Sequence, residues 1–332
     1  MSLIRNDYWT FRIFDYPRLQ KFVMSVICLG LLIINYDESI WLHKLLIPLI
    51  ALNLAYLSWL IFPFTVFAKK HVYKVIKKNE DDQVCIMISN VYQDNTNHKG
   101  CLEIIKKAKP DVVLLLETDA KWEKGTNDLE NYYPFSIKVP LENTYGMLLY
   151  SKLELKDSVV KYMVEDDIPS IHTKVCLKSG TEIQLYAVHP TPPVPNENPR
   201  STERDKELLL VADLAKASSI PVIVVGDLND VAWSYTTELF LKMSGLLDPR
   251  RGRGFFNSFH AHYPFLRFPL DHAFISTDFK LAGMKRLHNF DSDHFPIYIH
   301  VQYEAAASLQ QESLEVTMED KETAEEKKAA IT

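Results

Sequence analysis

The sequence predicts an α/β fold, a two-sheet α/β sandwich flanked by helices and preceded by N-terminal transmembrane helices. Short, β-branched apolar runs alternate with helical patterns, and several of these runs end directly in a carboxylate, amide or imidazole, which favours the sandwich. A long uncharged apolar stretch before residue 70 favours the N-terminal helices. With 332 residues, of which 47% are hydrophobic and 24% charged, the chain has room for one large domain with additions.

Residues 1–80 predict a membrane anchor with two transmembrane helices, at about residues 22–36 and 45–68. Residues 45–68 contain no charge and exceed the roughly 20 residues that a span requires. The first run is shorter, so it is also compatible with an interfacial helix or the core of a signal peptide. No small-residue cleavage site follows it, because residues 35–38 read NYDE. The sequence therefore favours a second span over these alternatives.

Basic residues flank both apolar runs, whereas the turn between them carries Asp37 and Glu38. The flanking residues are Arg5, Arg12, Arg18 and Lys21 before the first run, and Lys69, Lys70, Lys74, Lys77 and Lys78 after the second. With two spans, both basic flanks would lie in the cytoplasm, as the positive-inside bias requires. We therefore expect a multi-pass protein of the cell membrane whose following domain is cytoplasmic. With one span the basic clusters would fall on opposite sides, and the orientation would stay open.

Residues 81–303 predict one domain of alternating strands and helices, and residues 304–332 predict a disordered charged tail. The expected strands cover residues 85–90, 112–117, 144–150, 171–177, 182–188, 222–225, 268–276 and 297–301. The expected helices cover residues 98–109, which Pro110 ends, and 204–217. The proline-rich residues 190–199 predict a loop beside a substrate cleft. The tail is rich in Ala, Glu, Gln and Lys, a composition that cannot bury a core.

Six strand ends or interiors carry side chains suited to metal or acid/base chemistry. They are Asn90, Glu117, His189, Asp227 with Asn229, Asp271, and Asp293 with His294. A buried strand cannot cheaply carry such groups unless they face a metal, a partner or water. Residues 226–229 (GDLN) would by themselves be read more simply as a turn. Because the pattern recurs six times, we interpret it as one polar site at a sheet edge.

In this order the residues resemble the endonuclease/exonuclease/phosphatase superfamily, metal-dependent phosphoesterases that share the pancreatic deoxyribonuclease fold. The resemblance covers about residues 84–303, and its specificity lies in the ordered set. Residues 189–193 (HPTPP), Arg200 and residues 250–254 (RRGRG) are similar to the bacterial membrane-anchored members. Phe259 stands where we would expect the family to carry Trp, a departure that bears on substrate preference more than on activity.

The resemblance implies a metal site and a hydrolytic site. Glu117 would bind Mg²⁺ or Mn²⁺ together with Asn90, and Asp293 would support the metal or the acid/base network. The other implied catalytic residues are His189, Asp227, Asn229, Asp271 and His294. Asp227 would hold or deprotonate the attacking water. Asn229 would orient this water or a phosphoryl oxygen.

His294 would face the phosphate as donor or base, with Asp271 fixing its ring. His189 would face the phosphoryl oxygens or the leaving group, while His272, one residue after Asp271, points to the opposite face of its strand and is structural. Substrate phosphate would meet Arg200, Arg251, Arg253 and Arg267, although a solvated loop suits each of these arginines equally well.

Charge and cysteine content narrow the choice of function. The charges of residues 1–80 (10 basic, 5 acidic) and 304–332 (3 basic, 8 acidic) cancel, so residues 81–303 carry the net charge of −6. An acidic domain disfavours tight binding of duplex nucleic acid, which favours lipid or small phosphoesters but leaves nucleic acid open. The four scattered cysteines indicate no disulfide framework. The expected partners are the phosphoester substrate and the lipid bilayer, with no obligate protein partner evident.

Two alternatives to a magnesium or manganese phosphoesterase are a catalytically silent membrane-anchored scaffold and a zinc hydrolase. A silent member would be expected to lack one of the key polar residues, and none is missing. The zinc hydrolase is disfavoured because the histidines lack i, i+4 helical pairing and the ligand set is rich in oxygen.

Overall fold

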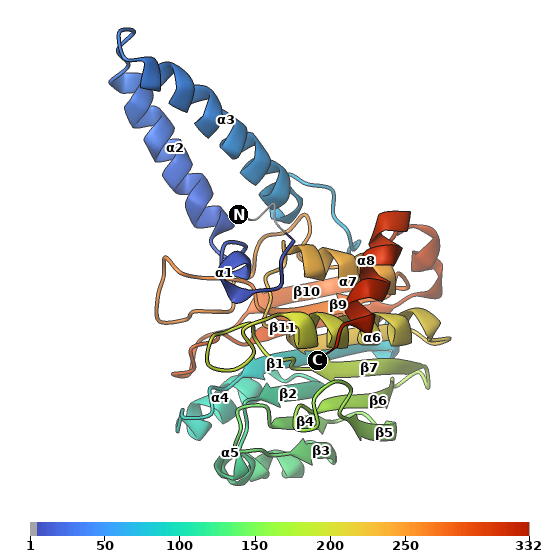
Figure 1. Ribbon diagram of the computed structural model, residues 1–332. Helices are drawn as coiled ribbons and strands as arrows, with labels where there is room; N and C mark the ends of the chain where they lie inside the picture. Colours follow the sequence, from blue (N-terminus) through green and yellow to red (C-terminus); the bar gives the residue numbers. More distant parts are fainter. Residues whose placement is uncertain (1–4, 332) are drawn as a thin grey trace.

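The computed structural model describes residues 5–331, and its centre is a sandwich of two β-sheets (Figure 1). The six-stranded sheet comprises, in spatial order, β10 (Phe279–Arg286), β11 (Ile297–Tyr303), β1 (Gln83–Asn90), β2 (Val112–Leu116), β4 (Met147–Ser151) and β3 (Phe135–Val139). The five-stranded sheet comprises β5 (Leu155–Lys161), β6 (Ser170–Cys176), β7 (Glu182–Val188), β8 (Val222–Asp227) and β9 (Asp271–Ile275). The predicted two-sheet α/β sandwich is therefore confirmed.

Helices cover the outer face of each sheet. The six-stranded sheet packs against α4 (His98–Ala108) and α5 (Ala120–Gly125). The five-stranded sheet packs against α6 (Thr202–Ala217) and α7 (Tyr235–Ser244), and α8 (Met318–Ala329) lies on these two helices. The remaining elements are α1 (Trp9–Arg12), α2 (Arg18–Ile34), α3 (Trp41–Ile61) and the 3₁₀ turns η1 (Phe62–Phe64), η2 (Glu80–Asp82), η3 (Asn127–Asn131) and η4 (Ala305–Leu309).

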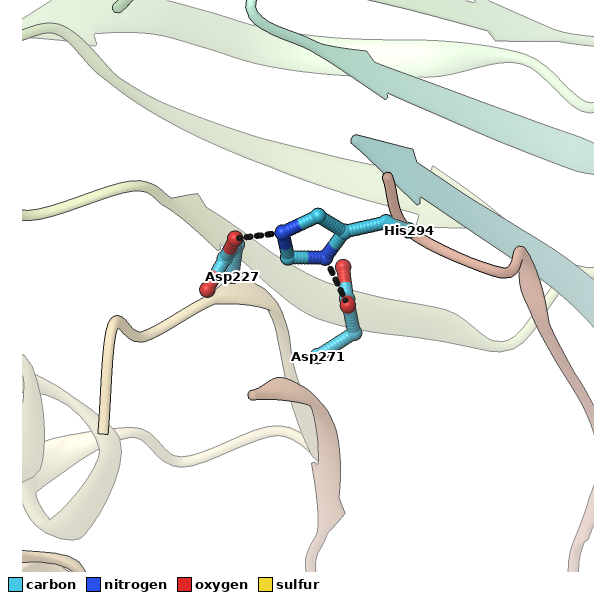
Figure 2. Close-up of side chains that lie close together, drawn as sticks. All are labelled: Asp227, Asp271 and His294. Carbon is cyan, nitrogen blue, oxygen red and sulfur yellow. Dashed lines mark hydrogen bonds and ion pairs between the residues drawn. The ribbon is translucent and has the colours of Figure 1, made fainter. Parts of the chain in front are cut away.

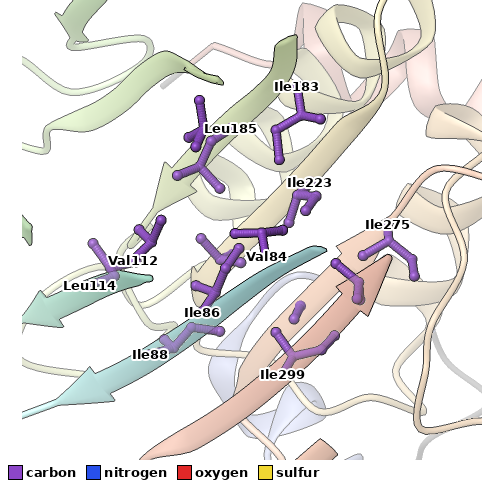
Figure 3. Packing of buried hydrophobic residues seen from close by; sticks show 14 of the residues in the cluster. Val84, Ile86, Ile88, Val112, Leu114, Ile183, Leu185, Ile223, Ile275 and Ile299 are labelled. Atoms are coloured by element: carbon purple, nitrogen blue, oxygen red, sulfur yellow. The ribbon is translucent and has the colours of Figure 1, made fainter. Parts of the chain in front are cut away.

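The main hydrophobic core lies between the two sheets (Figure 3). Alternate residues of β1 divide between the two faces: Ile86 and Ile88 pack in the central core, whereas Met87 packs toward α4 and α5. Both faces of the central strands are buried, so these strands read as continuous apolar runs rather than as alternating patterns. This explains why the runs at 112–116 and 222–225 were recognisable in the sequence.

Strand direction and register gather the polar strand ends at one edge of the sandwich. β1 and β2 are parallel, with Asn90 opposite Leu116, so Asn90 and Glu117 emerge at the same edge. β7 and β8 are also parallel, and antiparallel β9 places Asp271 directly opposite Asp227. β11 runs antiparallel to β1, so the loop that precedes it returns His294 to this edge.

Gly226 allows β7 and β8 to approach each other beside Asp227. Its φ is +151°, and a Cβ atom there would lie 1.8 Å from the carbonyl oxygen of Val188. Any side chain at this position would therefore push apart the two parallel strands that deliver His189 and Asp227.

Several elements differ from the sequence-based expectations. Strands β3, β5 and β10 and helices α5 and α7 were not expected. β5 is an edge strand in which most side chains are exposed, so it lacks the apolar run that marks a buried strand. The strand expected at 144–150 begins at Met147, and the one expected at 268–276 begins at Asp271, because the preceding residues are turns and loop.

Helices α2 and α3 form an antiparallel hairpin that projects from the sandwich (Figure 1). The segment Trp41–Phe64 is the one stretch within residues 5–331 that is long and apolar enough to cross a membrane. Helix α2 has 17 residues, about 25 Å of helix, which is shorter than a usual span. The helix bounds correct the expected 22–36 and 45–68: α2 starts earlier, at Arg18, and α3 ends at Ile61, ahead of Pro63 in η1.

Both ends of this hairpin attach to the same part of the sandwich. At the base of α2, Arg18 donates to the main-chain oxygen of Trp233 and pairs with Asp15 at 2.7 Å. After α3, the ring of Phe64 packs edge-on against Trp233, with centroids 6.1 Å apart. The indole Nε1 of Trp233 in turn donates to the carbonyl oxygen of Asp15 at 2.8 Å. Residues on either side of the hairpin are therefore fastened to one cluster. Within the described residues, no flexible linker separates the hairpin from the sandwich.

The C-terminal segment is folded, which corrects the expectation of a disordered tail at 304–332. Thr317 and Asp320 form a capping box at the start of α8, and Ala324 is completely buried between Leu209 and Leu239. Lys327 pairs with the buried carboxylate of Asp205 on α6 at 2.7 Å. The sequence did not reveal the packing of this helix, because its composition is polar. Only one small apolar residue and a few ion pairs attach it to the sandwich.

Asp205 joins three separate segments of the chain. Its carboxylate accepts from Arg12 of α1 at 2.8 Å, from the adjacent Arg204 at 2.9 Å and from Lys327 of α8 at 2.7 Å. Burial opposes ionisation, but these three cations hold the pKa of Asp205 well below its usual range. Removing one cation would leave the buried charge less compensated, so both chain termini contribute to the stability of α6.

We predict that Ala324→Glu releases α8 from the sandwich, because a carboxylate would replace a methyl group buried between two leucines. The measurement is the rate of tryptic cleavage after Lys321, Lys327 and Lys328, which should rise in this variant. The matched control is Ala329→Glu, an exposed position on the same helix, where the rate should stay near that of the wild type. Equal protection of both variants would contradict the docked arrangement.

Candidate active site

An imidazole lies between two carboxylates at the sandwich edge (Figure 2). The Nδ1 atom of His294 is 2.7 Å from Oδ2 of Asp271, and its Nε2 atom is 3.5 Å from Oδ2 of Asp227. All three side chains are almost completely buried. Because β8 and β9 place the two aspartates opposite each other, the ring of His294, from the loop that precedes β11, fits between them.

Hydroxyl and amide groups hold the backbone around this cluster. Ser258 Oγ accepts from the N–H of Asp271 at 3.1 Å, and Ser292 Oγ accepts from the N–H of His294 at 3.0 Å. Ser292 also donates to the carbonyl oxygen of Asn90 at 2.8 Å, which ties the loop of His294 to the end of β1. The cluster is therefore preorganised by the main chain.

Charge pairing sets the protonation states of His294 and Asp227. Burial disfavours the imidazolium of His294, but the carboxylates of Asp271 and Asp227 outweigh it and raise the pKa of His294 to about 10. Burial also opposes ionisation of Asp227, yet His294 and His189 hold the pKa of Asp227 below its usual range. At neutral pH, His294 is accordingly a donor and Asp227 an anionic acceptor.

A second carboxylate group lies beside this cluster, around Glu117. The side-chain amide of Asn90 donates to Oε1 of Glu117 at 2.7 Å and to Oδ2 of Asp227 at 3.1 Å, so it joins the two groups. Burial, together with the nearby charges of Asp293 and Asp227, raises the pKa of Glu117 to about 7, although Asn90 and His294 act against it. Glu117 has a φ of +58°, a conformation uncommon for a residue with a side chain.

The chemistry around Glu117 fits a hard divalent cation. One buried oxygen of Asp293, Oδ1, has no hydrogen-bond partner among the described residues, and Oε2 of Glu117 meets only the N–H of Gln93, at 3.4 Å. A cation would satisfy these oxygens and offset the crowding of acids. Asp227, Asp271 and His294 also offer ligand atoms within 4.8 Å of one another, but these atoms already pair among themselves. Glu117 and Asp293 are therefore the better candidates, whereas Asn90 turns its amide N–H toward Glu117 and its Oδ1 accepts from the N–H of Tyr92 at 3.0 Å.

Asn229 and His189 complete the predicted set at the same edge. The main-chain N–H of Asn229 donates to Oδ1 of Asp227 at 2.9 Å, and its side-chain amide donates to the carbonyl oxygen of Pro190 at 2.9 Å. His189 is buried with its Nδ1 atom unpartnered in the described structure, and burial lowers the pKa of His189 to about 4. His189 is therefore neutral at pH 7, and its ring lies 5.2 Å from that of Tyr145.

The predicted substrate arginines are dispersed, and two of them serve the base of the hairpin. Arg251 lies 5.5 Å over the ring of Phe64, and Arg253 donates to the carbonyl oxygens of Pro249 and Val72. Arg200 lies over Tyr8 of the N-terminal segment. Arg267 lies 5.0 Å over the ring of Phe295, the neighbour of His294. Arg267 thus contacts the neighbour of His294, whereas Arg251 and Arg253 make their contacts elsewhere.

Sequence reasoning missed the residues that orient the cluster. Ser258 and Tyr145 carry no motif, and their contacts with Asp271 and His189 span long distances in sequence. Phe259, noted only as a departure from the expected Trp, packs on His294 with ring centroids 5.0 Å apart. Its aromatic character was the one signal available. The structural assignment of His272 agrees with its contacts, because its Nε2 meets the carbonyl oxygen of Asp230 at 2.8 Å.

Comparisons with known proteins agree with this architecture. The model of the Endonuclease/Exonuclease/phosphatase family matches residues 87–294. Humanized D. rerio TDP2 carrying 14 mutations is similar in structure, with 17% identity, a TM-score of 0.56, and coverage of 67% of this chain and 99% of that one. An endonuclease/exonuclease/phosphatase from Beutenbergia cavernae has 15% identity, a TM-score of 0.55, and coverage of 67% and 72%.

The human Nocturnin catalytic domain is also similar, with 17% identity, a TM-score of 0.53, and coverage of 67% of this chain and 94% of that one. At these identities the likeness shows a shared fold. No curated protein matches the sequence.

We predict that Asp271→Asn lowers the pKa of His294 by roughly 1 to 3 in metal-free protein, because it removes one of the two flanking charges. Histidine NMR titration measures this value, and Asp94→Asn, which changes an exposed acid, should leave it unaltered. An unchanged pKa in Asp271→Asn would contradict the proposed ion pair.

The same pairing predicts how stability depends on pH. The folded pKa of His294, about 10, lies above the unfolded value of about 6.5, so its contribution is complete below pH 6.5 and is lost as the pH rises through 10. The difference in unfolding free energy between the wild type and Asp271→Asn should therefore shrink over this range in urea titrations. A difference that grows with pH would contradict this assignment.

Proposed function

Because the chain belongs to the endonuclease/exonuclease/phosphatase family, we propose that it is a membrane-anchored phosphoesterase that requires Mg²⁺ or Mn²⁺ and uses residues 81–303 as its catalytic domain. Members of the family are hydrolases of phosphoester bonds. The observation that carries the proposal is the pairing of His294 with Asp227 and Asp271 beside the carboxylate of Glu117. The donor, the acceptor and the carboxylate that we propose as a cation ligand thus meet at one edge of the sandwich.

In this proposal, His294 donates a proton-bearing Nε2 to a phosphoryl oxygen while Asp271 fixes its ring. Asp227 accepts a hydrogen bond from the attacking water and takes its proton, and the N–H of Asn229 orients the carboxylate. Neutral His189 donates to a phosphoryl oxygen or to the leaving group. A cation bound by Glu117 and Asp293, with Asn90 beside it, would neutralise charge on the phosphoryl oxygens.

Asn90 has a second role, because it connects the two halves of the site. Its amide contacts both Glu117 and Asp227, so a shift of the cation ligand would move the acceptor as well. This contact supports one reaction centre rather than two separate polar clusters. Loss of the amide in Asn90→Leu would leave two carboxylates facing each other without their shared donor.

We predict that Glu117→Gln, Asp227→Asn and His294→Gln each reduce phosphodiester hydrolysis at least about 100-fold, since each removes a charge or a proton donor from the reacting centre. The assay uses the full-length protein in detergent with Mg²⁺ on single-stranded DNA, duplex DNA, RNA, sphingomyelin and phosphoinositides. EDTA should abolish turnover, and added Mg²⁺ should restore it.

The matched control for this series is Asp94→Asn, an exposed acid outside the site, which should retain wild-type turnover. Thermal unfolding of every variant separates lost chemistry from lost folding. Residual activity above about one tenth in a folded variant would overturn the assigned role. Silence of the wild type on every substrate would favour a scaffold that keeps the fold without the activity.

The helical hairpin supports the second part of the proposal, insertion into the cell membrane with the catalytic domain on the cytoplasmic side. Large apolar side chains of α2 and α3 face outward, and those of Leu52 and Trp59 are among the most exposed. Since both ends of the hairpin are fastened near Trp233, two crossings would return the chain to the side of the sandwich. Exposed Lys69 and Lys70 follow α3 and suit a cytoplasmic surface.

We predict that Ser39→Cys, in the turn between α2 and α3, reacts with a membrane-impermeant maleimide from outside intact cells. Ile76→Cys, an exposed position on the sandwich side, should react only after permeabilisation. Both variants would carry Cys28→Ser to remove the exposed native thiol. Reaction of both positions from outside, or protection of both, would contradict a two-crossing hairpin with a cytoplasmic domain.

A further inference from the structure

One loop connects the candidate active site with the helical hairpin. Residues 259–268 form a narrow loop closed at its base, where the N–H of Phe259 donates to the carbonyl oxygen of Phe268 at 3.0 Å. Also at the base, the ring of Phe259 packs on His294, and the N–H of Ala261 donates to the carbonyl oxygen of Asp293 at 2.6 Å. Any displacement of this loop would therefore shift the contacts with His294 and Asp293 at the proposed reaction centre.

The tip of the loop carries apolar side chains that the sandwich does not bury. Phe265 is 87% exposed, and Tyr263 and Leu266 are more than half exposed. Three large apolar side chains within four residues form a concentrated apolar surface, whereas single exposed hydrophobic residues are ordinary. A surface of this kind suits an apolar environment better than water.

The loop tip lies directly beside the base of α2. The side-chain amide of Gln20 donates to the carbonyl oxygen of Phe265 at 2.9 Å. Leu19, Val23 and Met24 line an apolar cleft with Phe265. In Figure 1 the orange loop projects next to the lower end of α2. The exposed surface of the loop is thus continuous with the apolar surface of the proposed membrane hairpin.

Two guanidinium groups lie near the base of the loop, at the ring of Phe295. Arg267 and Arg286 lie 5.0 and 4.3 Å from the ring centre of Phe295, and no carboxylate within residues 5–331 forms an ion pair with either of them. Nε of Arg267 is buried without a hydrogen-bond partner in the described part of the chain. Paired guanidinium groups that lack a carboxylate are suited to a phosphate group.

We propose that residues 259–268 are an interfacial loop that inserts Phe265 and Leu266 into the bilayer beside α2, so that the active site faces the lipid headgroups. The substrate would then be a phosphoester carried by a membrane lipid, an assignment that rests on the proposed phosphoesterase activity. Arg267 and Arg286 would meet headgroup phosphates, while Phe259 at the base of the loop packs on the ring of His294. Because residues 81–303 are acidic, long-range electrostatic attraction would not draw anionic substrate to this domain. The proposed anchor and this loop would instead hold the site at the lipid surface.

A fluorescent depth probe tests the placement of the loop independently of activity. Phe265→Cys in the Cys28→Ser protein would be labelled with nitrobenzoxadiazole and reconstituted into vesicles of phosphatidylcholine and phosphatidylserine. Its emission should shift to shorter wavelength, and lipids carrying nitroxides near the headgroup should quench it. The matched control, Tyr132→Cys directly after η3, is also largely exposed, at 70%, but lies far from the hairpin in sequence and should resist quenching. A probe at 265 that stays as polar and as unquenched as the control overturns the proposal.

Substrate preference tests the second half of the proposal. The double variant Phe265→Asp, Leu266→Asp should lower the ratio of turnover on sphingomyelin or phosphoinositide vesicles to turnover on soluble bis(p-nitrophenyl) phosphate by at least about tenfold. Tyr132→Asp should leave this ratio unchanged, and circular dichroism would verify the folding of both proteins. An unchanged ratio in the double variant overturns the lipid assignment, as does cleavage confined to nucleic acid.

The two readouts distinguish failure of this inference from failure of the proposed function. A quenched probe in a protein that cleaves no phosphoester would support the interfacial loop and overturn the phosphoesterase together with its lipid substrate. An unquenched probe in a protein that cleaves soluble diesters would overturn the loop placement and keep the phosphoesterase.

Discussion

The packing of two sheets against each other is the constraint on which the rest of this structure depends. Asp227 and Asp271 belong to the five-stranded sheet, whereas Asn90 and the loop of His294 belong to the six-stranded sheet. Their hydrogen bonds therefore cross from one sheet to the other, and the apolar core between the sheets sets the distances. Because each buried charge would be costly without its partner, the same pairing that suits catalysis also fixes the register of the two sheets at this edge.

The attachment of the helical hairpin follows a similar logic. Arg12 and Lys327 come from the two ends of the chain, yet both pair with the buried Asp205 of α6, and Arg18 donates to the main-chain oxygen of Trp233. A membrane anchor joined by a flexible linker would leave the orientation of the active site free. Here, both ends of the hairpin are fastened around Trp233, so the hairpin and the sandwich are held in one arrangement.

Because the hairpin is held in place, the loop at residues 259–268 can connect it with the proposed reaction centre. It reaches from the ring of His294 to the base of α2, a position at which the proposed membrane surface and the proposed reaction centre meet. The anchor would then determine which substrates reach the site as well as where the protein resides. Phe259, the departure from the expected family pattern, occupies the base of this loop.

The sequence by itself determined the sandwich, because strands buried on both faces read as apolar runs, and it singled out the polar residues at or next to six of the strands, because buried polar groups there are conspicuous. It also located the apolar hairpin within a few residues. Only the tertiary structure decided which oxygens pair with His294, that α8 is docked through Ala324 and Lys327, and that Arg251 and Arg253 support the hairpin base. These contacts join residues distant in sequence, and their free energy comes from partners whose proximity no local pattern encodes.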